Sequence, residues 1–319
     1  MISEESESLT IVTIKDYLKL ARVDHWFKNI FMLPGMVFAF LYYEFPFTAE
    51  LLWNVLAGVL STCLIASANY VINEWLDAEF DRHHPVKKHR PSVTKDLDVR
   101  WIFFMYSILI ILGLGLAIMV SNNFFLFEFL LLVMGFLYNV RPFRTKERPY
   151  IDVLSESVNH PIRFILGWYI FVPDLFPPSS ILVAYWMGGA FLMGCKRLAE
   201  YRFIGNPEIA GNYRRSFCFY TEKSLLISVF FYALTSTFFL GIFLIKHRIE
   251  LLLTFPLFAL LFSWYLNITM LEDSTAQKPE KLYTHWKFMV YCILLSIIFL
   301  ALLFIDIPPL HYFLRNTFG

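Results

Sequence analysis

Charged residues are scarce in this sequence. They make up 17% of its 319 residues, and the formal net charge is +1. A chain so close to neutrality has no general attraction for a polyanion, so we do not expect nucleic acid as a partner.

Cysteine is also rare, because Cys63, Cys195, Cys218 and Cys292 are scattered singly along the chain. This pattern excludes the paired spacing of a zinc site and the dense cysteines of a small disulfide-stabilised domain. We interpret all four as core residues. The first ten residues lack the basic leader of a cleaved signal peptide, so we expect the first apolar span to remain as an anchor.

Apolar residues dominate instead, at 58% of the chain with 19% aromatic. A membrane core of about 30 Å needs roughly 20 apolar helical residues per crossing. Apolar runs that approach this length cover about residues 26–43, 52–76, 101–120, 123–140, 150–171, 179–198, 224–245, 250–271 and 287–305. We therefore predict an all-α, polytopic membrane protein with a bundle of about nine transmembrane helices.

The positions of lysine and arginine predict the orientation. The N-terminal segment and the loops after the second, fourth, sixth and eighth spans hold 23 of the 27 basic residues. Short cytoplasmic loops are enriched in these residues, so we expect a cytoplasmic N-terminus. We place a cytoplasmic segment at 1–25, one transmembrane domain at 26–305 and a non-cytoplasmic tail at 306–319. Ile14 and Leu18 alternate with lysines, which predicts an amphipathic surface helix within the first segment.

Polar side chains recur every four residues where the second span ends. Asn73, Asp77 and Asp81 lie on one helical face, and Glu74 adjoins them. Oxygen ligands grouped in this way suit Mg²⁺ that bridges to a diphosphate, so we predict a metal site here. The alternative is an ordinary solvated helix end.

A dense basic loop follows these acids directly. It contains Arg82, His84, Lys87 and Arg90, which we predict to hold phosphate oxygens beside the metal. Taken alone, such a loop could be a topology signal or a contact with anionic lipid head groups. Its position beside the acids favours a phosphate site.

A second polar stripe lies within the fifth span, where Asp152, Glu156, Asn159 and Arg163 recur at steps of three and four residues. Charged groups inside a span are costly, so this face should point into the protein. Asp152 and Glu156 could bind a second metal, with Arg163 near the phosphates. The alternative is a structural ion pair between Glu156 and Arg163.

Three more lysines and one arginine complete the predicted phosphate site. Lys28 lies near the N-terminus, Lys146 in the loop after the fourth span, and Lys196 and Arg197 at the end of the sixth. Since all belong to one membrane face, we expect the polar loops to form a cap over a site at the level of the lipid head groups.

These motifs resemble the UbiA superfamily of intramembrane prenyltransferases, and most closely its decaprenyl-phosphate phosphoribosyltransferase branch. The branch pattern N-D-x-x-D-x-x-x-D-R-x-H-P-x-K-R-x-R-P is matched by Asn73, Asp77, Asp81, Arg82, His84, Pro85, Lys87, Arg90 and Pro91. The superfamily stretch R-x-x-x-W-x-K-N is matched by Arg22, Trp26, Lys28 and Asn29. The branch signature K-R-x-A-E is matched by Lys196, Arg197, Ala199 and Glu200. Glu74 and Glu156 stand where the pattern has aspartate.

The resemblance implies a Mg²⁺-dependent transferase in a bacterial cell membrane, with its active site facing the cytoplasm. The substrates would be phosphoribosyl pyrophosphate and a polyprenyl phosphate, and the catalytic acids would be Asp77, Asp81, Asp152 and Glu156. Metal ligation would fall to Asn73, Glu74, Asp77, Asp81 and Asp152. The sequence leaves a homo-oligomer open.

Three alternatives remain at this point. The first keeps the fold but transfers a prenyl group from a prenyl diphosphate to an aromatic or other small acceptor. The second is a transporter whose intramembrane charges line a polar path, although we find neither inverted repeats nor interrupted helices in the sequence. The third is a structural subunit with inactive motifs.

Overall fold

The computed structural model describes residues 12–43, 46–272, 274–277 and 279–313. Its longer helices are α2 (Leu33–Tyr42), α3 (Ala49–Leu76), α6 (Val99–Val120), α7 (Asn122–Asn139), α9 (Asn159–Tyr169), α10 (Ser179–Ile204), α12 (Glu222–His247), α13 (Phe255–Thr269) and α14 (Trp286–Leu302). Within these ranges the chain forms helices and no strand, which confirms the all-α prediction. The first ten residues and Arg315 lie outside the described residues.

Several helices present apolar side chains outward, as a membrane protein requires. Among the described residues, five helical stretches are long and apolar enough to cross a bilayer: Ala49–Leu76, Val99–Val120, Asn122–Asn139, Glu222–His247 and Ile249–Thr269. On α6, for example, Ile111 is 69% exposed and Leu112 is 54% exposed. Apolar surface this extensive is stable in lipid and not in water. The protein is a multi-pass helical bundle, while the number of crossings stays a prediction.

A single turn residue, Val158, divides the fifth predicted span in the structure. Helix α8 (Ile151–Ser157) stops at Val158, and α9 begins at the next residue. Pro161 explains the interruption, because it has no N–H to bond the carbonyl of Ser157. The His160 ring bonds that carbonyl instead, with Nδ1 3.0 Å from the oxygen.

Helices α2 and α9 cross at unusually short range, which is possible because each has a glycine at the contact. A Cβ atom on Gly35 would lie 2.0 Å from the carbonyl oxygen of Phe164. A Cβ atom on Gly167 would lie 2.1 Å from the carbonyl oxygen of Met32. These contacts hold α9, and with it α8, against α2 and the end of the segment before it.

The first predicted span begins differently from expectation. Residues 26–32 belong to a 3₁₀ helix, η1 (Val23–Met32), and not to an α-helix.

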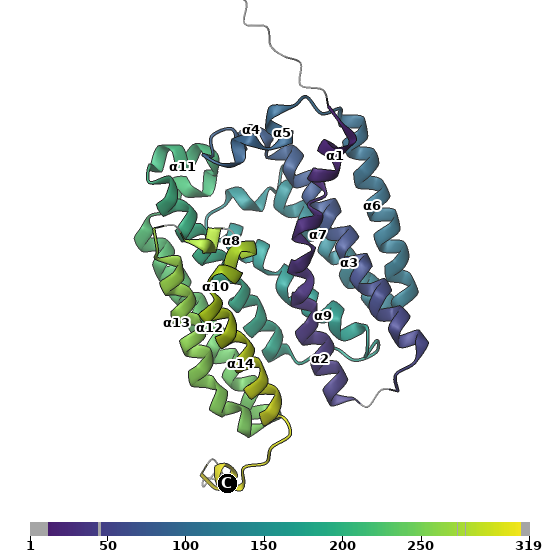
Figure 1. Ribbon diagram of the computed structural model, residues 1–319, viewed down its shortest axis with the longest axis vertical. Coiled ribbons are helices and arrows are strands. Elements are labelled where there is room, and N and C mark those ends of the chain that lie inside the picture. The colour runs from purple at the N-terminus through teal and green to yellow at the C-terminus, as the bar shows by residue number, and fades with distance from the viewer. Residues whose placement is uncertain (1–11, 44–45, 273, 278, 314–319) are drawn as a thin grey trace, which may run out of the picture.

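The short polar elements gather at one end of the bundle (Figure 1). They are α1 (Ile14–Leu20), α4 (Ala78–Asp81), η2 (Lys87–His89), α5 (Pro91–Thr94), η3 (Thr145–Glu147), α11 (Pro207–Tyr213) and η4 (Arg215–Phe219). Helix α15 (Pro308–Phe313) lies at the opposite end, beyond α14. This arrangement brings together the loops that the basic residues assigned to one membrane face. Short 3₁₀ helices complete the second half of the bundle: η5 (Ile249–Thr254), η6 (Thr275–Gln277) and η7 (Pro279–Thr284).

The structure bears on the predictions for the four cysteines and for the amphipathic helix near the N-terminus. Cys63 and Cys195 are buried and Cys292 is half-buried, but Cys218 is exposed, so its interpretation as a core residue is wrong. Cys218 lies on η4, at the surface of the polar end. Helix α1 exists as expected, with Ile14 and Leu18 exposed. Its position on a membrane surface and the proposed domain boundaries stay predictions.

Candidate functional site

The first acidic motif continues the helical path of α3. The N–H of Asp77 lies 2.9 Å from the carbonyl oxygen of Asn73, and the N–H of Asp81 lies 2.8 Å from that of Asp77. The three residues therefore keep the four-residue spacing expected from the sequence. Asn73 also donates from Nδ2 to Asp77 Oδ2 at 3.1 Å, which fixes the orientation of that carboxylate.

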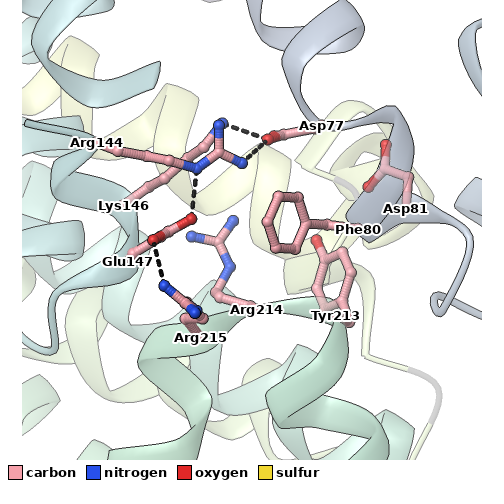
Figure 2. Close-up of a pocket in the computed structure, with 9 residues that line it drawn as sticks. All are labelled: Asp77, Phe80, Asp81, Arg144, Lys146, Glu147, Tyr213, Arg214 and Arg215. Carbon is pink, nitrogen blue, oxygen red and sulfur yellow. Dashed lines mark hydrogen bonds and ion pairs between the residues drawn. The ribbon is translucent and has the colours of Figure 1, made fainter. Parts of the chain in front are cut away.

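Asp77 is paired with two cations from the 140–150 loop (Figure 2). Arg144 NH2 lies 2.8 Å from Asp77 Oδ1, and Lys146 Nζ contacts the same oxygen. Burial alone would raise the pKa of Asp77, but the two cations outweigh it and hold this pKa below its ordinary value. Burial lowers the pKa of Lys146 to about 8, although Asp77 opposes this shift. Lys146 also donates to Asn139 Oδ1 at 2.8 Å.

The other two acids of this motif share one arginine. Arg90 NH1 lies 2.7 Å from Asp81 Oδ2 and 2.9 Å from Glu74 Oε1. Arg22 NH1 adds a third contact, 3.1 Å from Glu74 Oε1. Burial would lower the pKa of Arg90, but Glu74 and Asp81 raise it above its usual value. In this structure Arg90 therefore neutralises the acids.

The basic loop is attached to the end of α10. Lys87 Nζ lies 2.8 Å from Glu200 Oε1, and the Tyr213 hydroxyl lies 3.0 Å from the same oxygen. His84 Nδ1 accepts hydrogen bonds from the backbone N–H groups of residues 86 and 87, at 3.1 Å each. His84 thus shapes the loop, while Arg82 is exposed.

The second acidic motif is held by Arg197. Its Nε lies 3.2 Å from Asp152 Oδ2, and its NH2 contacts Glu156 Oε2. Asp152 is fully buried and also accepts from the Tyr220 hydroxyl at 2.7 Å and from Ser216 Oγ at 3.1 Å. Arg197 is fully buried as well. The structure therefore uses Arg197 to neutralise acids, and both Asp152 oxygens have partners.

Arg163 is not the partner of Glu156, so that alternative is wrong. Its Nε donates to Asn29 Oδ1 at 2.9 Å, and its NH1 lies 3.3 Å from the carbonyl oxygen of Asn159. These contacts connect α9 with η1 in the interior of the bundle. Lys28, on η1, lies over the Tyr70 ring at 5.5 Å, and Lys196 is half-buried on α10.

A pocket opens between the acidic motif and two loops (Figure 2). It is lined by Asp77, Phe80, Asp81, Arg144, Lys146, Glu147, Tyr213, Arg214 and Arg215. Of the predicted site residues it brings together Asp77, Asp81 and Lys146. Asp152, Glu156 and the remaining predicted residues do not line it.

Sequence reasoning missed the contribution of the segment after α11. Tyr213, Arg214 and Arg215 enter the pocket from the α11–η4 junction. The two consecutive arginines were the available signal, but a basic pair in a cytoplasmic loop is also an ordinary topology marker. Glu147 had no such signal, since only the fold brings its carboxylate to Arg215.

Metal ligation can be judged from the donor atoms. Within the described ranges, no three histidine, cysteine or acidic side chains form a group suited to a metal ion. Asp77 is paired with Arg144 and Lys146, and Asp81 is paired with Arg90. Their carboxylates, with the Asn73 amide oxygen, are nevertheless the hard oxygen donors that Mg²⁺ prefers. The donor set therefore fits Mg²⁺ once Arg90, Arg144 and Lys146 leave these carboxylates for other partners.

A family model supplies the decisive comparison, since that of the UbiA prenyltransferase family matches residues 30–298. The chain belongs to the UbiA prenyltransferase family. The match covers most of the bundle, including both acidic motifs, and confirms the resemblance found in the sequence. Membership in the UbiA family supports the predicted transferase class.

Curated relatives with related chemistry match parts of the chain. A decaprenyl-phosphate phosphoribosyltransferase of Corynebacterium glutamicum is 27% identical over 57% of this chain and 54% of its own length. The enzyme of that name from Mycobacterium tuberculosis is 28% identical over 57% of this chain and 59% of its own length. A protoheme IX farnesyltransferase of Geobacillus kaustophilus is 26% identical over 53% and 57%. The matches thus span less than two thirds of these relatives.

Solved structures confirm the UbiA fold over nearly the full chain. A UbiA homologue from Archaeoglobus fulgidus, bound to DMAPP and Mg²⁺, has a TM-score of 0.69 and 22% identity, covering 90% of this chain and 98% of its own. A solved structure of a digeranylgeranylglyceryl phosphate synthase has a TM-score of 0.57 and 18% identity, and the match covers 90% of this chain and 96% of its own. At these identities the likeness shows the fold alone.

Proposed function

We propose that the protein is a metal-dependent intramembrane transferase that binds a diphosphate donor in the pocket beside Asp77. The observation that carries the proposal is the composition of that pocket. Carboxylates of Asp77 and Asp81 lie beside the cations Arg144, Lys146 and Arg214. Acids can hold a metal and basic groups can hold phosphate oxygens, so both halves of a metal–diphosphate complex find partners in one place.

Mg²⁺ is the proposed cofactor, with Asn73, Asp77 and Asp81 as its ligands and Glu74 in support. When bound, the ion stabilises the negative charge that develops on the departing pyrophosphate. A homologue of this fold was solved with Mg²⁺ and a prenyl diphosphate, which supports the proposal. We assign Asp152 mainly to holding Arg197, because both of its oxygens already have partners. A metal-binding role of Asp152 or Glu156 stays a prediction.

The proposed donor is phosphoribosyl pyrophosphate and the proposed acceptor a polyprenyl phosphate. Four curated relatives carry the name decaprenyl-phosphate phosphoribosyltransferase, and the motifs after the second and sixth spans agree with that branch. In the reaction, an oxygen of the lipid phosphate bonds to the anomeric carbon of the ribose. The bond from that carbon to pyrophosphate breaks, and pyrophosphate leaves with the bonding electrons.

The chain's own residues contribute binding and positioning. Arg144 and Lys146 are placed to hold the donor diphosphate, and Lys28 and Lys196 are proposed to hold the remaining phosphates. No strong general base is required, because a lipid phosphate is already ionised near neutral pH. The active site would face the cytoplasm of a bacterial cell, since the polar loops that line it carry most of the basic residues.

The test is an assay of purified full-length protein in detergent with Mg²⁺, a polyprenyl phosphate and radiolabelled phosphoribosyl pyrophosphate. A parallel reaction contains a prenyl diphosphate and 4-hydroxybenzoate, as one family alternative is prenyl transfer to an aromatic acceptor. We expect label from the ribose donor in the lipid phase. Prenylated aromatic product would replace the proposed substrates, and no transfer in either reaction would contradict a transferase function with these donors.

A further inference from the structure

Arg214 is a largely buried cation whose hydrogen-bonding groups are poorly satisfied. Its side chain is 15% exposed, and NH1 lies 3.8 Å from Asp152 Oδ2 and 3.4 Å from the Tyr138 hydroxyl. Nε is buried and has no hydrogen-bond acceptor among the residues that the structure describes. A guanidinium removed from water normally has short, directed contacts to anions. Arg214 therefore has hydrogen-bonding capacity left for a further anion.

The location of Arg214 indicates where that anion would lie. Its side chain extends from the α11–η4 junction into the centre of the pocket, between Glu147 and Phe80 (Figure 2). The guanidinium carbon lies 5.9 Å from the ring centroids of both Tyr213 and Phe217, which restrict its orientation. An anion bound in this pocket would meet the fork directly.

Glu147 already supplies a carboxylate to the neighbouring arginines. Its Oε1 lies 2.6 Å from Arg144 Nε, and its Oε2 lies 3.4 Å from Arg215 NH1. The carboxylate thus connects the 140–150 loop with η4 across the pocket (Figure 2). Arg144 is buried and Arg215 is exposed, so the bridge runs from the interior to the rim. Phosphate oxygens would compete for the same two guanidinium groups.

We propose that Arg214 and Arg215 bind the donor diphosphate and that Glu147 is an internal carboxylate that the diphosphate displaces. Before binding, Glu147 neutralises Arg144 and Arg215. On binding, a phosphate group replaces the Glu147 carboxylate and reaches the unsatisfied fork of Arg214. This inference rests on the proposed function, and it adds residues and an exchange step to the donor site.

The exchange has a direct thermodynamic consequence. Donor binding must break the two ion pairs of Glu147, so the carboxylate weakens the affinity for any phosphate ligand. Removing its charge should strengthen binding, whereas removing an ordinary surface ion pair would leave it unchanged. If Glu147 were a metal ligand instead, removing its charge would weaken binding in the presence of Mg²⁺.

The experiment is calorimetric titration of the full-length protein with pyrophosphate in saturating Mg²⁺. We expect Glu147→Gln to lower the dissociation constant by about twofold to fivefold, since a competing ion pair is worth up to about 1 kcal/mol. Glu208→Gln, an exposed glutamate on the adjacent α11, is the matched control and should leave the constant unchanged. An unchanged or higher constant in Glu147→Gln would overturn the exchange.

Two arginine variants complete the test. Arg215→Gln should weaken pyrophosphate binding, and adding Glu147→Gln to it should recover less affinity than Glu147→Gln gains alone, since the two residues are coupled. Arg214→Gln should weaken binding at least about tenfold while lowering the unfolding temperature of the ligand-free protein only slightly, because its contacts to Tyr138 and Asp152 are long. A lower unfolding temperature with unchanged binding would make Arg214 structural. Failure of the unaltered protein to bind pyrophosphate would instead contradict the proposed function.

Discussion

Arg197 Nε lies 3.2 Å from Asp152 Oδ2, and both side chains are excluded from solvent in the interior of the bundle. The same guanidinium contacts Glu156, so one residue of α10 neutralises both acids of the second motif on α8. Breaking a buried pair leaves an uncompensated charge, which costs far more than breaking a surface pair.

We therefore expect Arg197→Gln to lower the free energy of unfolding by about 3–5 kcal/mol. Combining it with Asp152→Asn should cost less than the sum of the two single changes. The control is Arg202→Gln, whose pair with Glu222 is partly exposed and should matter by less than about 1 kcal/mol. Equal losses in Arg197→Gln and Arg202→Gln, measured by denaturant unfolding in detergent, would contradict a buried structural pair.

Substitution of the proposed metal ligands should abolish turnover without unfolding the protein. Asp77→Ala and Asp81→Ala each remove a charged oxygen donor, so we expect kcat/KM to fall about a hundredfold or more. Asp96→Ala removes an exposed acid from the segment between α5 and α6 and should have no effect. Turnover at the unaltered rate in either of the first two variants would remove that residue from the metal site.

The close crossing of α2 and α9 predicts an unusual sensitivity to one methyl group. Gly35→Ala places Cβ against backbone that cannot rotate away, so we expect a loss of about 1–3 kcal/mol or more. Gly115→Ala is the matched control, since no atom lies within 4 Å of the position that its Cβ would take and alanine favours a helix. Thermal unfolding should separate the two variants, and similar stability would mean that the helices can move apart.

The docking of α1 should depend on pH. A hydrogen bond from Lys95, at 2.8 Å, holds the pKa of Asp16 below its ordinary value, with help from Thr13. The stabilisation from the pair of Asp16 and Lys95 is therefore fully present above the ordinary pKa of an aspartate. It is lost as the pH falls through the lowered pKa of Asp16. Hydrogen exchange of residues 14–20, corrected for intrinsic rates, should increase as the solution is acidified below about pH 4.

Asp16→Asn is the control for this pH effect. The variant cannot titrate at position 16, so its exchange should be faster at neutral pH and nearly independent of acidification. If the unaltered protein and the variant responded alike to acid, another group would be responsible for the pH dependence.

The fold was largely predictable because its determinants are local and repetitive. Apolar runs of about twenty residues and the bias of basic residues predict a helical membrane bundle without tertiary information. The interruption at Val158 was less accessible, although Pro161 was a visible signal three residues later. The close approach at Gly35 and Gly167 required knowledge of which helices meet, and no spacing within one helix reveals that.

The candidate site was predictable only in part. The spacing of Asn73, Asp77 and Asp81 follows directly from helix geometry, and the structure preserves it. The partners of the basic residues could not be derived, because each depends on how a loop folds over the bundle. The sequence suggested that Lys87 and Arg197 bind phosphate, whereas the structure pairs them with Glu200 and Asp152.

The acids of the first motif lie at the end of a long helix, while the cations that neutralise them lie in loops. Asp77 depends on Arg144 and Lys146, and Asp81 depends on Arg90. The helices can consequently insert and pack while these carboxylates are still hydrated, and the site forms only when the loops close. Opening these loops would expose charged groups to water while leaving the apolar contacts between the helices in place, so it would cost less free energy than global unfolding.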